Sequence, residues 1–333
     1  AYLGGFAVIA LFAPIWIVRF EWKMAGAVSA LLILTAIALI AISGDAETVY
    51  IAMAALGAGA SMVFTIGLTI LSRAKDPERA FGAKLMVEMA LAGVLIFLMT
   101  QFIITKFGFA GFVGGTLVTY ALSVLFVFKL PSNFLKREAR EADSNAGQHS
   151  LPAWLAVFGL FIQFAAFSAI WAFMERIGLD NGLNASFIGT ALTMSIVAGL
   201  AGAALATFFG NKHGHLVPLV IGLFVSIACI VLLATTNGSS SYIVAACGIN
   251  AMLQFTLAYQ MGLVAHTDYG GKVAVMIPFF LAFSGAIGPG VAGSVIEANG
   301  FIPVYWGFAL VTTLTIITSI WIGKHEPKHT TNR

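Results

Sequence analysis

The sequence predicts an all-α, polytopic membrane protein, and three observations lead to this fold class. Of the 333 residues, 60% are hydrophobic and only 9% are charged, and the mean hydropathy is +0.97. An average soluble domain has about 25% charged residues, so a soluble globular protein is excluded. Apolar runs recur along the chain at about 20 residues each, the length that a helix needs to cross a hydrocarbon core of about 30 Å.

Eleven apolar stretches qualify as membrane-spanning helices, because each is apolar on all sides and too long for the roughly 9–11-residue strands of a membrane β-barrel. The first five are separated by short polar connectors, and six more follow a long one. In order, they cover residues 1-18, 24-43, 48-72, 80-104, 108-130, 153-174, 186-209, 215-235, 241-265, 273-296 and 302-322.

The basic residues predict the orientation of these spans. If successive connectors alternate sides, one side carries every Lys and Arg except Lys106 and Arg176. Short cytoplasmic loops retain Lys and Arg, so we predict a cytoplasmic C-terminus. The net charge of +3 reflects this orientation and indicates no nucleic-acid partner. The chain starts inside a span and has an odd number of spans, so we expect one further span before it.

The polar segment 131-152 is predicted to be a cytoplasmic linker between two helical bundles. It mixes charges of both signs and has no apolar periodicity. The bundles are residues 1-130, with five spans, and residues 153-333, with six spans and a short cytoplasmic tail. Many transporters consist of two such halves.

Short motifs carry a family resemblance. IWIVRFEWK, with Arg19 and Lys23, and FFGNKHGH are degraded forms of a GxxxDxxGRK loop, with Asn211 at the position of the Asp. GAIGPGVAG, around Pro289, is similar to a motif that antiporters carry in their fifth helix, although here it lies in the penultimate span. With the span count and the linker, these motifs resemble the major facilitator superfamily (MFS) of secondary transporters. The resemblance implies a 12-helix, two-bundle fold in which the visible helices are the second to the twelfth.

Polar side chains inside the spans are the candidate substrate-binding groups, because an unpaired amide in hydrocarbon is costly and faces protein or water. The candidates are Gln163, Trp171, Asn250 and Gln254, together with a hydroxyl stripe that contains Ser61, Thr65 and Thr69. In the superfamily, the helices that these positions match line a central cavity. The alternative is hydrogen bonding between helices without a ligand, which we favour for the hydroxyl stripe.

Glu88 is the candidate coupling residue, because a carboxylate within a span is costly and can take up protons when it is desolvated. The alternative is a pair with Lys84, one helical turn earlier, near the membrane surface. Two charge pairs are candidate gates. Asp76 and Arg79 would act on the cytoplasmic side, and Glu175 with Arg176 on the outer side.

Other motifs indicate packing or loops. Gly57, Gly59, Gly199, Gly202 and the GAIGPGVAG run are expected to let helices cross closely. The residues His213, His215 and His266 are interpreted as loop histidines with no spacing for a metal site. Cys229 and Cys247 form neither a disulfide framework nor a CxxC motif. No metal or other cofactor is predicted.

These observations favour a secondary active transporter, a permease that moves a sugar-like, amphipathic or aromatic solute by alternating access. Symport or antiport is expected, with protons as the candidate coupling ion, in a bacterial plasma (inner) membrane. The partners are the solute, the protons and the lipid bilayer. GxxxxGK[ST] and GxSxG are absent, so neither an ATP-driven pump nor an enzyme is predicted. A polytopic membrane enzyme and a membrane sensor remain the alternatives.

Overall fold

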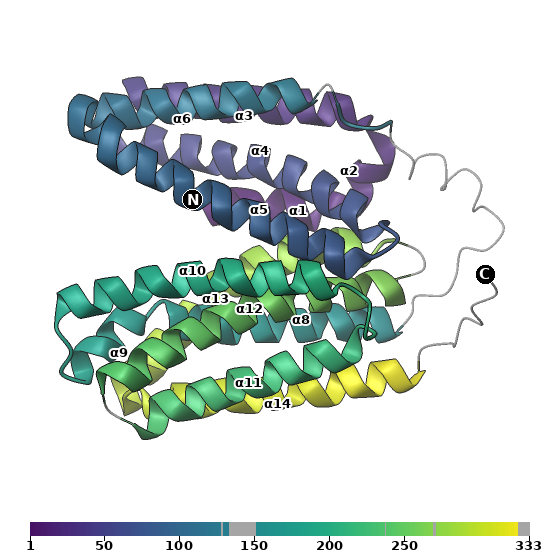
Figure 1. Ribbon diagram of the computed structural model, residues 1–333. Helices are drawn as coiled ribbons and strands as arrows, with labels where there is room; N and C mark the ends of the chain where they lie inside the picture. Colours follow the sequence, from purple (N-terminus) through teal and green to yellow (C-terminus); the bar gives the residue numbers. More distant parts are fainter. Residues whose placement is uncertain (128, 133–150, 237, 269–270, 326–333) are drawn as a thin grey trace. The chain divides into compact units, whose positions relative to one another are not determined.

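The computed structural model (Figure 1) describes residues 1–127, 129–132, 151–236, 238–268 and 271–325, and these ranges contain helices and no β-strand. The prediction of an all-α chain is therefore confirmed for the described residues. Most of the predicted linker 131-152 and the end of the C-terminal tail lie outside them.

The chain divides into two compact units. The first comprises Ala1–Ile70, Ala90–Gln148 and Val275–Phe283, and the second comprises Leu71–Met89, His149–Ala274 and Ser284–Arg333. The bundles expected at 1-130 and 153-333 stay a prediction. The compact units differ from these bundles in two segments, because Leu71–Met89 belongs to the second unit and Val275–Phe283 to the first.

Helices of the first unit follow the predicted spans, with one bend. The elements are α1 (Tyr2–Leu11), α2 (Ala13–Arg19), α3 (Trp22–Ile42), α4 (Ala46–Ser72), the second half of α5 (Pro77–Leu98), a π-helix (Met99–Ile104), α6 (Thr105–Val127) and the start of α13 (Ile277–Asn299). The predicted span 1-18 is two helices at 64° to each other. Pro14 lies in the first turn of α2, where its missing N–H favours the start of a new helix.

The start of α4 is fixed by a side-chain cap. The Thr48 backbone N–H donates to Asp45 Oδ2 over 2.7 Å. This hydrogen bond to the charged carboxylate lowers the pKa of Asp45. The cap satisfies one of the N–H groups that the first turn of a helix leaves without a partner.

The predicted connector at 105–107 is helical instead, and the backbone turns at Gly108. This glycine has φ +57° and ψ −141°, a conformation that favours glycine. Beyond it, Gly111 lies against Ile103 and Gly115 against Met99, so the start of α6 packs on the π-helix that precedes it. The spans predicted at 80-104 and 108-130 therefore follow each other without a separate connector, and the chain turns at Gly108 just after the second helix begins.

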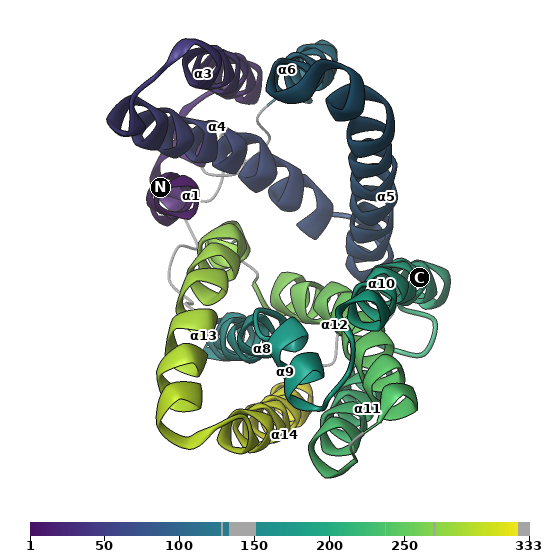
Figure 2. The same cartoon turned by 90° about the vertical axis from the view of Figure 1, so that its left-hand side faces the viewer.

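The second unit is built around its longest helix, α12 (Ser239–Thr267). Its other elements are the first half of α5, α8 (Leu151–Trp171), α9 (Met174–Asp180), α10 (Ala185–Phe209), α11 (Leu216–Thr235), a 3-10 turn (Ala274–Met276, of which Ala274 belongs to this unit), the second half of α13 (Ile277–Asn299) and α14 (Ile302–His325). Figure 2 shows α12 among α8, α10 and α11, and all three pack on it. In its most apolar stretch, 61% of the residues are buried, more than in any other candidate span of the described chain.

Glycines allow the close helix crossings in this unit, as the sequence predicted. A Cβ atom on Gly202 of α10 would overlap the backbone of Ala251 in α12. A Cβ on Gly288 of α13 would overlap Ser168 and the backbone carbonyl of Ala165 in α8. At the same crossing, Ser168 Oγ donates to the Ser284 carbonyl oxygen over 3.1 Å. Both contacts join helices backbone to backbone, which is how helices associate in lipid.

Among the described residues, nine helices are long and apolar enough to cross a membrane, or ten if the bent pair α1–α2 is one span. One of the nine is the 51-residue stretch Pro77–Val127, which contains the turn at Gly108. The expected count of eleven stays a prediction. Outward apolar stripes, such as Val217, Ile221 and Phe224 on α11, suit contact with lipid. The protein is an integral membrane protein.

Candidate functional site

A short segment between α4 and α5 packs on the end of α10 within the second unit. Asp76 caps α5, since its Oδ1 accepts from the Arg79 backbone N–H over 3.0 Å. Its Oδ2 accepts from the backbone N–H of Asn211, just after α10, over 3.2 Å. The Nε atom of Arg79 lies 3.6 Å from Asp76 Oδ2. The predicted Asp76–Arg79 pair therefore exists, and Asp76 links the start of α5 to the end of α10.

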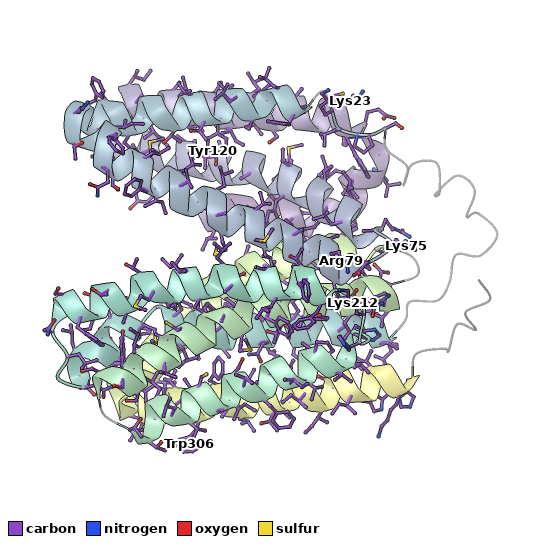
Figure 3. All side chains as sticks on the ribbon, in the orientation of Figure 1. Lys23, Lys75, Arg79, Tyr120, Lys212 and Trp306 are labelled. Carbon is purple, nitrogen blue, oxygen red and sulfur yellow. The ribbon has the colours of Figure 1, made fainter. Side chains whose placement is uncertain are left out.

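Several basic side chains gather at this end of the second unit. Figure 3 shows Lys75, Arg79 and Lys212 there, and Trp306 at the opposite end. Tryptophan is common at the membrane surface, where one edge of its ring meets water.

Gly210 lets the two segments meet. It ends α10 with φ +49°, and a Cβ atom there would lie against the carboxylate of Asp76 and 3.2 Å from Arg79 Cβ. The Tyr259 hydroxyl of α12 donates to the Gly210 carbonyl oxygen over 2.8 Å. The end of α10 is thus held by α5 on one side and by α12 on the other.

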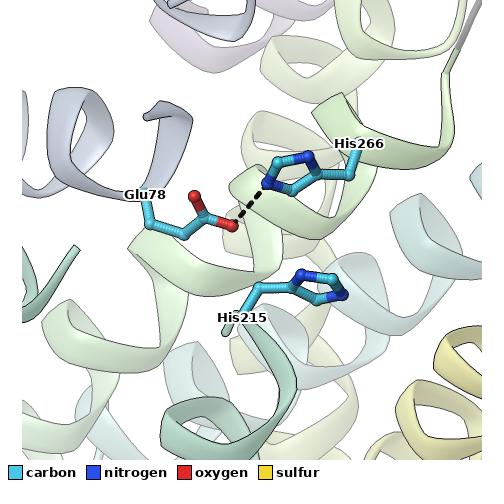
Figure 4. A group of neighbouring side chains, drawn as sticks. All are labelled: Glu78, His215 and His266. Atoms are coloured by element: carbon cyan, nitrogen blue, oxygen red, sulfur yellow. Dashed lines mark hydrogen bonds and ion pairs between the residues drawn. The ribbon is translucent and has the colours of Figure 1, made fainter. Parts of the chain in front are cut away.

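Glu78, in the first turn of α5, is fully buried among the helices of this unit. Its Oε1 lies 2.9 Å from Nε2 of His266, near the end of α12 (Figure 4). His215, which precedes α11, stacks on the His266 ring with centroids 5.1 Å apart. One ligand atom from each of these three residues lies within 4.8 Å of the others. Three elements far apart in sequence therefore bring a carboxylate and two imidazoles together.

The space for Glu78 depends on a glycine in the facing helix. A Cβ atom on Gly262 of α12 would lie 2.7 Å from Glu78 Cγ and 2.8 Å from Cδ and Oε1. Such distances are shorter than real side-chain contacts. Gly262 therefore lets the carboxyl group lie directly against α12.

The predicted amides are buried, and they differ in their partners. Asn250 Nδ2 donates to the Ser195 carbonyl oxygen of α10 over 2.9 Å, which is the helix-to-helix bond that the sequence left as an alternative. Gln254 Nε2 lies 3.6 Å from Sδ of Met89 in α5. The Oε1 atoms of Gln163 and Gln254 are both buried and have no hydrogen-bond partner among the described residues. These two oxygens remain available as acceptors.

The other predicted cavity residues are engaged in packing. Trp171 stacks on Phe167, with centroids 5.9 Å apart and planes at 15°. Thr65 Oγ1 donates to the Ser61 carbonyl oxygen within α4, in the first unit, over 2.7 Å. Ser61 Oγ is buried without a hydrogen-bond partner among the described residues. Most of the hydroxyl stripe thus bonds within its own helix.

Glu88 pairs with Lys84, as the alternative interpretation of the sequence expected. The Lys84 Nζ to Glu88 Oε2 distance is 2.5 Å, and the Glu88 side chain is 46% exposed. An ion pair one turn apart on a helix surface is a common local stabilisation. The structure therefore contains the local pair that the sequence left as the alternative, and the coupling role of Glu88 stays a prediction.

Glu175 and Arg176 lie in the short helix α9 and are both exposed. Arg176 Cζ lies 5.7 Å from the ring centroid of Phe173, a cation–π distance. The Tyr242 hydroxyl of α12 donates to the carbonyl oxygen of Met174 at the start of this helix over 2.8 Å. That bond holds α9 on α12, whereas the two charged side chains face outward.

Sequence reasoning missed the Glu78 cluster. His266 was expected in a loop, and this is wrong because it lies in the last turn of α12. The sequence separation between His215 and His266 matches no known metal-binding motif. The fold, and not the local sequence, brings the two side chains together. The one available signal was Glu78 itself, an acidic residue directly after Asp76 and Pro77 at the start of a span.

Similarity to known proteins is found at the level of structure. No model of a protein family and no curated protein matches the sequence. The E. coli fucose:proton symporter FucP superposes with a TM-score of 0.75 at 16% identity, covering 96% of this chain and 88% of that chain. The human organic anion transporter MFSD10 gives a TM-score of 0.78 at 14% identity, covering 96% and 83%.

A third similar structure is the proton:xylose symporter XylE, with a TM-score of 0.71 at 10% identity, covering 98% of this chain and 84% of that chain. FucP and XylE are transporters of the major facilitator superfamily, and each of the three similarities extends over almost the whole of this chain. The chain therefore has the fold of the major facilitator superfamily, as its motifs and its central linker led us to expect.

Proposed function

We propose that the protein is a secondary transporter that moves a small solute by alternating access. The similarity in fold to a fucose:proton symporter, a xylose symporter and an organic anion transporter supports this proposal. The single observation that carries it is the pair of buried amide oxygens, Gln163 Oε1 and Gln254 Oε1, which lack partners among the described residues. A buried acceptor without a partner is costly unless a ligand or water donates to it.

The proposed substrate is a sugar-like or amphipathic solute. Carboxamide oxygens accept hydrogen bonds from hydroxyl groups, and the stacked aromatic rings of Phe167 and Trp171 lie in the same helix as Gln163. The proposed gates are Asp76 with Arg79 at one end of the second unit, and Glu175 with Arg176 in α9. The proposed location is the bacterial inner membrane, with the C-terminus in the cytoplasm.

Counterflow in proteoliposomes tests the transport proposal. We expect the full-length protein to exchange at least one radiolabelled solute from a panel of aldohexoses, aldopentoses, organic acids and aromatic compounds. Gln163→Ala and Gln254→Ala should each raise the half-saturating solute concentration by about 2- to 12-fold, since one neutral hydrogen bond contributes about 0.5–1.5 kcal/mol. The matched control is Gln101→Ala, an exposed amide in the π-helix, which should leave exchange unchanged. No exchange of any solute, or equal losses in all three variants, would contradict the proposal.

Proton coupling through Glu88 is the second part of the proposal, and it has its own measurement. We expect the transported solute to drive alkalinisation or acidification of vesicles that contain a pH-sensitive dye. In Glu88→Gln, solute exchange should persist while the pH change is lost, because the neutral amide cannot carry a proton. The control is Lys84→Gln, which removes the pairing cation but keeps the carboxyl group. A Glu88→Gln protein that still moves protons with the solute excludes this role.

A further inference from the structure

We propose that Glu78, His215 and His266 bind a divalent transition-metal ion of the Zn²⁺ class. All three residues belong to the second unit, and they come from the start of α5, the residue before α11 and the last turn of α12. Neither the fold nor the proposed transport of a solute requires a metal here, so the site is an addition to that function.

The distances suit a shared ion. A Zn²⁺ ion binds imidazole nitrogen and carboxylate oxygen at about 2.0–2.2 Å, which places two ligands of a tetrahedral site about 3.3 Å apart. Glu78 Oε1 and His266 Nε2 are 2.9 Å apart, and a ligand atom of His215 lies within 4.8 Å of both residues. The ion would replace the hydrogen bond between Glu78 and His266. The His215 ring is stacked on His266 with the planes at 27°, so it must rotate to direct a nitrogen at the same ion.

Burial and charge give an independent reason. The Glu78 side chain is fully buried, and its second oxygen, Oε2, has no hydrogen-bond partner among the described residues. A buried carboxylate is costly unless a cation or hydrogen bonds compensate its charge. A divalent cation supplies that compensation, and the 29% exposure of the His266 side chain leaves a route by which it enters.

The donor set selects the kind of metal. Two imidazoles and one carboxylate suit Zn²⁺ and its first-row neighbours, whereas Mg²⁺ and Ca²⁺ prefer oxygen ligands alone. Three protein ligands leave a fourth position for water. A bound ion would also join α5 to α11 and α12 through three side chains, so it would stabilise the folded second unit.

The test uses the full-length protein, purified without a polyhistidine tag and stripped of metal with a chelator. Titration with Co²⁺ should give one equivalent per chain with the visible absorption of a tetrahedral ion, and Zn²⁺ should displace it. Zn²⁺ should also raise the melting temperature, because an ion that binds only the folded state stabilises that state. Glu78→Gln, His215→Gln and His266→Gln should each weaken binding by at least about 100-fold, since loss of an outer-shell partner alone costs 10–100-fold.

His213→Gln is the matched control, because His213 is exposed and lies two residues from His215. It should leave the affinity unchanged. His215→Gln keeps the bond between Glu78 and His266, so it stays informative if the other two variants fold poorly. The proposal is overturned if the wild type shows no saturable one-to-one binding, or if His213→Gln weakens binding as much as the cluster variants. Binding is measured without transport, so its failure leaves the transport proposal untouched.

Discussion

We expect Gly202→Val to force α10 away from α12 and to destabilise the second unit strongly. The Cβ atom would overlap the backbone carbonyl of Ala251 and lie 3.0 Å from its Cα. Backbone atoms cannot rotate away as a side chain can, so the helices must separate. Overpacking of this kind costs about 1–3 kcal/mol or more. The separation would also pull Asn250 from the Ser195 carbonyl oxygen that it contacts at 2.9 Å.

The measurement is the melting temperature and the monodispersity of the purified protein in detergent. Gly189→Val is the matched control, because Gly189 lies in the same helix and a Cβ there would meet no described heavy atom within 4 Å. The control should melt close to the wild type, whereas Gly202→Val should melt well below it or fail to give a monodisperse peak. Equal melting temperatures for the two variants would show that the crossing tolerates a larger separation.

The sequence predicted the helical fold well, because membrane helices follow one simple rule. Each needs about 20 apolar residues, and the backbone must be satisfied within the helix. The uncertain places are those where local geometry decides. Pro14 bends the first span by starting a new helix, and Gly108 makes a turn inside a stretch that is otherwise helical. Apolar length cannot reveal a turn whose flanking residues are as apolar as the spans.

The candidate site was less predictable, because its contacts join residues far apart in sequence. The pairing of Glu88 with Lys84 is local and could be foreseen from the i,i+4 spacing. For Asn250, the sequence predicted a hydrogen bond between helices as an alternative, but it did not predict that the partner is Ser195. The contact of Glu78 with His266 joins residues 188 positions apart, and it depends on Gly262 leaving room for a carboxyl group. No periodicity in one sequence encodes such a contact.

The contact between Glu78 and His266 predicts that their contributions to the free energy of unfolding are strongly coupled. With a chelator present, we expect His266→Ala to destabilise the protein more than Glu78→Gln does. The first variant leaves a fully buried carboxyl group without its 2.9 Å bond to the imidazole, whereas the second replaces the charge by an amide that can still hydrogen-bond. Leaving a buried polar group unsatisfied costs about 1–3 kcal/mol, and more if it is charged.

The double variant should therefore lose less stability than the two single losses combined, with a coupling free energy of about 1–3 kcal/mol. Unfolding in mixed detergent micelles, followed for the wild type, both single variants and the double variant, measures it. The control cycle pairs Glu78→Gln with His213→Ala, whose imidazole packs on Phe209 instead, and it should be additive within about 0.5 kcal/mol. Additivity in the first cycle would mean that the buried contact contributes no net stability. The carboxyl group of Glu78 would then be held in place by packing, including its close approach to Gly262.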